Sequence, residues 1–85
     1  MPVTQTAIQI LRPLADLQPG QSGVVTELSG PPTVKLRLLE MGLTPGIPVR
    51  VIRLAPLGDP IEIQVRGYRL SLRRTEAAAI IIEGE

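Results

Sequence analysis

Apolar and polar residues alternate through most of the second half of the chain, which is the pattern of half-buried β-strands. The alternation is regular over residues 61–66 and again over residues 68–73, on either side of Gly67. Prolines and a glycine within residues 56–60 separate these segments from an earlier alternating run at residues 47–54. Because Pro and Gly favour turns, the pattern predicts three consecutive antiparallel strands.

The run at residues 47–54 changes parity part of the way along. Val49 and Val51 share one side of the predicted strand, whereas Ile52 and Leu54 fall on the other side. An extra residue that shifts the alternation is the mark of a β-bulge, so we expect this strand to bend or bulge near Ile52.

Residues 33–41 change to a helical pattern, with prolines before them and Gly42 where a left-handed C-terminal cap is expected. Helical spacing places three apolar residues on one face, namely Val34, Leu38 and Met41. Three others fall on nearly the opposite side, namely Leu36, Leu39 and Leu43. This short helix is therefore predicted to have two apolar faces.

Shorter segments complete the prediction. Residues 14–20 hold two leucines before a Pro-Gly pair, which predicts a turn that packs both leucines against the core. Residues 23–28 and 80–82 predict the first and last strands. Residues 75–79 predict a single helical turn with Thr75 as its N-cap. In the N-terminal tail, Ile8 and Ile10 alternate with polar neighbours and indicate an added edge strand.

Five short strands with one helix after the first are too few for a sandwich and suit a small, strongly bent barrel. We therefore expect a mainly β fold: a small SH3-like five-stranded barrel with one short α-helix inserted after the first strand. The N-terminal tail occupies residues 1–13, and the barrel domain occupies residues 14–85.

The composition of the 85 residues bounds the class of protein. Apolar residues make up 44% of the chain, but it has no Trp, no Phe and one tyrosine, so the core must be aliphatic. Cysteine is absent, which excludes disulfides and thiolate metal sites. No segment has the roughly 20 apolar residues that span a bilayer, and the N-terminus does not resemble a secretion signal. We expect the mature protein to be the whole chain and to lie in the cytoplasm.

The chain lacks the residues of most active sites. Without His or Cys it has no usual general base and no activated thiol, and its glycines do not form a phosphate-binding loop. We therefore predict no enzymatic activity, no catalytic residue and no cofactor.

Carboxylates leave one metal-binding alternative open. Asp59 and Glu62 lie close in sequence, and hard oxygen ligands of this kind bind Fe(II) or Mn(II) weakly. Glu76 with Glu83 is a weaker pair. Because no imidazole supports either pair, we predict no metal site and keep a metal-responsive regulatory module as an alternative function.

Six of the nine basic residues lie on the predicted sheet, namely Arg50, Arg53, Arg66, Arg69, Arg73 and Arg74. A small barrel that binds nucleic acid is thus a second alternative. Such barrels pair basic residues with aromatic stacking platforms, and only Tyr68 is available here. A solvated face or an anionic protein partner fits better, so we predict no nucleic-acid partner.

The outer face of the helix admits two interpretations. The N-terminal tail could cover it through Ile8, Ile10, Leu11 or Leu14. Alternatively, part of the face stays open as a docking patch, since exposed contiguous apolar surface usually marks a partner site.

Four segments together carry a specific family resemblance: residues 14–20 (LADLQPG), 37–46 (RLLEMGLTPG), 51–61 (VIRLAPLGDPI) and 66–73 (RGYRLSLR). From about Leu14 to Glu83, the chain resembles the FeoA family, the small cytosolic component of bacterial ferrous iron transport. The resemblance implies an SH3-like barrel without enzymatic activity that supports or regulates the membrane transporter FeoB. The same barrel occurs as the C-terminal domain of DtxR-type metal-dependent repressors.

The resemblance also implies a partner: the cytosolic GTP-binding domain of a FeoB-type transporter. We predict that the contact residues are Lys35, Leu36, Leu39, Leu43, Leu57, Gly58 and Asp59. Self-association through the helix face is an alternative use of the same surface. We expect contact with the membrane only by way of the transporter, and the sign of the regulation stays open.

Overall fold

The alternating runs in the second half of the chain form a three-stranded antiparallel meander. In this computed structural model, which describes residues 11–84, the strands are β3 (Pro48–Leu54), β4 (Ile61–Val65) and β5 (Tyr68–Leu72). Every second residue of β4 is buried, beginning with Ile61, as the period-two pattern predicted. The meander therefore has an inner side against the core and an outer side toward solvent.

The predicted irregularity in β3 is confirmed. The pairing of β3 with β4 shifts between Val51 and Arg53, so that Ile52 has no direct partner on β4. Because the extra residue changes the side to which the next residues point, Arg53 pairs beside Glu62 on the outer side.

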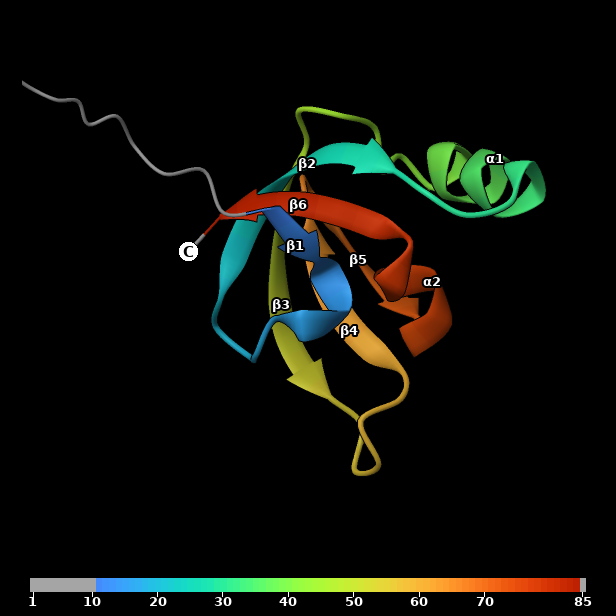
Figure 1. Ribbon diagram of the computed structural model, residues 1–85. Coiled ribbons are helices and arrows are strands. Elements are labelled where there is room, and N and C mark those ends of the chain that lie inside the picture. The colour runs from blue at the N-terminus through green and yellow to red at the C-terminus, as the bar shows by residue number, and fades with distance from the viewer. Residues whose placement is uncertain (1–10, 85) are drawn as a thin grey trace, which may run out of the picture.

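Three further strands extend the meander into one six-stranded sheet of order β1-β6-β2-β3-β4-β5 (Figure 1). They are β1 (Leu11–Pro13), β2 (Ser22–Leu28) and β6 (Ile80–Gly84). The five strands predicted for the barrel do not include β1, which is an edge strand that pairs along β6 from within the tail, where an added edge strand was predicted. The predicted contribution of Ile8 and Ile10 lies outside the described residues.

The core is aliphatic, as the composition indicated. Within residues 11–84 no polar or charged residue is buried, and the largest fully buried side chains are all Leu, Ile or Val. Leu14 begins a 3-10 helix over Leu14–Asp16 and Leu17 follows it; both lie in this core, which confirms their predicted packing. The sheet curls into a barrel-like shape (Figure 1), and these side chains form the core of the domain.

Two short helices accompany the sheet. Helix α1 (Pro32–Glu40) follows β2, as predicted, and helix α2 (Arg74–Ala78) follows β5. The prediction that Thr75 caps α2 is wrong, because the helix begins one residue earlier. Its N-cap is Arg73, whose backbone N–H donates a hydrogen bond to Glu76 Oε1 over 2.9 Å.

Candidate docking surface on the first helix

Helix α1 presents its two predicted apolar sides differently. On the inner side Leu38 is completely buried, and Val34 and Met41 pack against the core, as expected. On the outer side Leu36 is 58% exposed and Leu39 is 42% exposed. We call Leu36 and Leu39 the helix patch.

Leu43 does not belong to this patch, so the prediction that it shares an open face with Leu36 and Leu39 is wrong. Leu43 is completely buried in the core. The physical reason is Gly42, whose φ of +92° ends the helix and redirects the chain. The Leu43 N–H then donates to the Leu38 carbonyl at 3.1 Å, which closes the helix end over the core.

Polar contacts fix α1 on the barrel at two points. The Tyr68 hydroxyl on β5 donates a 2.6 Å hydrogen bond to the carbonyl of Met41, at the C-terminal end of the helix. Arg37 Nε lies 3.3 Å from Glu76 Oε2 on α2. Sequence analysis missed both contacts, although a tyrosine that packs on apolar residues commonly needs a partner for its hydroxyl. The two contacts hold the helix patch in a defined orientation.

The described part of the tail does not cover the helix patch. Leu14 is buried in the core, and Leu11 lies on β1 beside Glu83 of β6 and is 56% exposed. The other two candidates, Ile8 and Ile10, lie outside the described residues. Lys35, which was predicted to be a contact residue, is exposed on α1 next to Leu36 of the patch.

The turn between β3 and β4 is the second predicted contact. Leu57 at its tip is 96% exposed, and the turn projects from the end of the sheet away from α1 (Figure 1). Asp59 Oδ1 accepts a 3.0 Å hydrogen bond from the backbone N–H of Arg74, whose Nη1 donates to the Gly58 carbonyl at 3.3 Å. These contacts tie the turn to α2.

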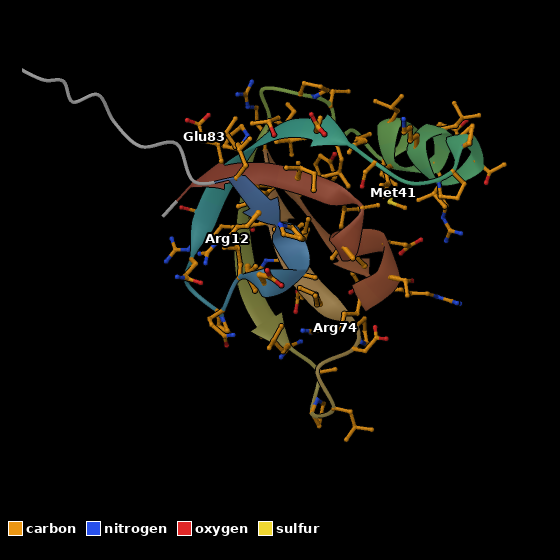
Figure 2. All side chains as sticks on the ribbon, in the orientation of Figure 1. Arg12, Met41, Arg74 and Glu83 are labelled. Atoms are coloured by element: carbon orange, nitrogen blue, oxygen red, sulfur yellow. The ribbon has the colours of Figure 1, made fainter. Side chains whose placement is uncertain are left out.

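The two predicted contacts are therefore separate surfaces. Figure 2 shows Met41, at the end of α1, and Arg74, beside the turn, far apart along the side of the barrel that carries α2. A partner that touched both surfaces would have to extend over α2.

Three of the four carboxylates of the metal-binding alternative, namely Asp59, Glu62 and Glu76, contact basic side chains or backbone N–H groups. Glu62 contacts Arg53 and Arg69, and Asp59 accepts from the Arg74 backbone. Glu76 contacts Arg37 and the Arg73 backbone. Among the described residues, no three acidic side chains gather into a group suited to a metal ion.

The helices within residues 11–84 are also too short and too polar to cross a membrane.

A curled antiparallel sheet around an aliphatic core, with an exposed apolar patch on helix α1, defines a small β-barrel domain. The FeoA domain model matches residues 12–84. The chain therefore belongs to the FeoA family.

Known proteins similar to the chain support this assignment. One is the "Fe(2+) transport protein A/Fe(2+) transporter FeoB fusion protein" of Porphyromonas gingivalis, 37% identical over 70 residues. The match covers 82% of this chain and only 8% of that relative, so the chain spans a small part of its length.

Two solved structures are also similar. A FeoA-like protein from Clostridium acetobutylicum matches with a TM-score of 0.82 and 31% identity, over 87% of this chain and 86% of that one. FeoA of Stenotrophomonas maltophilia, described as a prokaryotic SH3 domain protein and solved with zinc, matches with a TM-score of 0.71 and 29% identity, over 89% of both chains. The fold is therefore SH3-like, as predicted.

The predicted likeness to metal-dependent repressors is confirmed at the level of the fold. A manganese-dependent transcriptional repressor superposes with a TM-score of 0.82 at 20% identity, over 95% of this chain and 45% of the repressor. At this identity the match concerns the barrel fold alone.

Proposed function

We propose that this protein is a non-enzymatic, cytoplasmic accessory protein of bacterial ferrous iron transport that docks on the cytosolic GTP-binding part of a FeoB-type transporter. The observation that carries the proposal is the relative in which a FeoA protein and FeoB are fused in one chain. Fusion keeps two modules at a high effective concentration, which favours pairs that work in contact.

The helix patch is the primary contact in this proposal. Leu36 and Leu39 offer adjacent apolar surface, and the Tyr68 and Arg37 contacts hold their helix in place before any partner arrives. A pre-ordered apolar patch binds with a smaller entropic cost than a flexible one. Lys35 contributes at the rim.

The β3–β4 turn, with Leu57, Gly58 and Asp59, is a second contact in this proposal. A leucine that is 96% exposed at a hydrogen-bonded turn is suited to insert into an apolar pocket of a partner. Helix α2 lies between the turn and the helix patch, so the turn is a separate, secondary contact. We expect the loss of the turn contact to weaken binding less than the loss of the helix patch.

Binding to the purified GTP-binding part of the transporter tests the proposal, measured by calorimetry without nucleotide, with GDP and with a non-hydrolysable GTP analogue. Leu36→Asp should raise the Kd at least tenfold, because a carboxylate would lose water in an apolar interface. The matched control is Leu11→Asp, a residue 56% exposed on β1 against 58% for Leu36, which should change the Kd less than twofold.

Different results would contradict the proposal. No binding in any nucleotide state would exclude docking on this part of the transporter. Equal losses for Leu36→Asp and Leu11→Asp would exclude the helix patch as the contact. If Leu36→Asp instead converts a dimer into a monomer in analytical ultracentrifugation, the patch serves self-association.

A further inference from the structure

The charges of this chain are distributed unevenly although its net charge is only +1. Residues 50–74 hold six arginines and two acidic residues, a net charge of +4. The rest of the chain holds three basic and six acidic residues, a net charge of −3. The β3–β5 meander is therefore the basic pole of the molecule.

The register of the meander gathers part of this charge on its outer side. Arg50 on β3 lies opposite Gln64 on β4, which lies opposite Arg69 on β5. In the neighbouring row Arg53 lies opposite Glu62. Since adjacent strands are about 4.8 Å apart, these groups form a broad surface over three strands. We call Arg50, Arg53 and Arg69 the arginine face.

Glu62 and Gln64 fix two of the three arginines of this face, namely Arg53 and Arg69. Arg53 Nε lies 2.6 Å from Glu62 Oε1, and Arg69 Nη1 lies 3.5 Å from Glu62 Oε2. Arg69 Nε also donates to Gln64 Oε1 at 3.1 Å. The Glu62 side chain is only 20% exposed, whereas those of Arg53 and Arg69 are 77% and 59% exposed. The guanidinium groups of Arg53 and Arg69 therefore face solvent, and each has further N–H donors that these contacts do not use.

A shallow depression adjoins this face near the β3–β4 turn. Its volume is about 300 Å³, and it is lined by Arg53, Leu54, Ala55, Pro56, Pro60, Glu62 and Ser71. Arg53, bound to Glu62, and the Ser71 hydroxyl lie here beside apolar residues, so the depression continues the arginine face without adding a second basic group.

We propose that the arginine face binds the anionic phospholipid headgroups of a bilayer. Exposed arginines spread over a sheet surface complement a plane of phosphates. Nucleic acid fits less well, because the chain's only aromatic residue is Tyr68, whose hydroxyl is bound to Met41. This proposal rests on the proposed function, because docking on a membrane transporter is what brings the protein close to a bilayer. It adds a direct lipid contact where the sequence analysis expected contact only through the transporter.

Vesicle flotation at low salt tests the proposal with the whole protein. Vesicles of mixed phosphatidylglycerol and phosphatidylcholine should bind it, and pure phosphatidylcholine vesicles should not, with binding that weakens as salt is raised. Arg50→Gln and Arg53→Gln should each weaken binding about fivefold. Lys35→Gln removes the same charge from α1 and should change it less than twofold. Glu62→Gln removes the carboxylate between two arginines and should strengthen binding several-fold.

The outcomes separate this proposal from the proposed function. Absence of binding to the anionic vesicles, or equal losses for Arg53→Gln and Lys35→Gln, would overturn the lipid contact and leave transporter docking unaffected. If Arg53→Gln weakens binding to the transporter's GTP-binding part but the protein ignores vesicles, the face contacts protein and the lipid proposal is wrong. Conversely, Leu36→Asp should leave vesicle binding unchanged even where it abolishes docking.

Discussion

Leu43→Asp should abolish the folded domain, whereas Leu39→Asp should leave it folded. Leu43 is completely buried among aliphatic side chains, so the variant loses the packing of a leucine and buries a carboxylate without a partner. The cost should exceed about 5 kcal/mol, which is comparable to the whole stability of a small domain. Leu39 is 42% exposed, and its replacement should change the free energy of unfolding by less than about 1 kcal/mol.

Circular dichroism at 25 °C and a thermal melt of each variant measure this difference. A cooperative melt near the wild-type Tm for Leu43→Asp would show that Leu43 lies outside the core in solution. Unfolding of Leu39→Asp would show that some segment of the chain covers the helix patch and would remove it as a docking site. The two variants make the same chemical change, and together they test whether Leu39 belongs to the helix patch and Leu43 to the core.

Gly42→Ala should lower the stability by about 2 kcal/mol, or the Tm by roughly 10 °C. A side chain at a φ of +92° costs about 1 kcal/mol. In addition, a Cβ at this position would collide with the Tyr68 hydroxyl, which would break its hydrogen bond to Met41 at a further cost of about 1 kcal/mol.

Gly46→Ala is the matched control for this prediction. Gly46 has a φ of +95°, but a Cβ there would meet nothing within 4 Å, so its replacement should cost only the backbone term of about 1 kcal/mol. Tyr68→Phe removes the hydroxyl, so Gly42→Ala should cost less in that background than in the wild type. Equal effects of the two glycine variants, or strict additivity of Gly42→Ala with Tyr68→Phe, would contradict the proposed collision.

The local pattern of the sequence was enough to predict most elements of the sheet. Period-two alternation requires that one side of a strand be buried, which is why the inner residues of β4 and the bulge at Ile52 could be predicted. The same logic identified Leu36 and Leu39 as the outer side of α1. An edge strand was predicted in the tail, but the position of β1 at Leu11–Pro13 was not, because three residues are too few to show a period.

The sequence by itself determined a mainly β, aliphatic SH3-like barrel and the segments that assign it to the FeoA family. Only the tertiary structure decided that Leu43 is buried. The chain turns at Gly42, the residue before Leu43, so Leu43 no longer follows the helical spacing and enters the core. Only the tertiary structure brought Tyr68 to Met41, and joined Arg53 and Arg69 through Glu62 into one face. These contacts link residues distant in sequence, and periodicity reports the environment of a residue but not the identity of its partner.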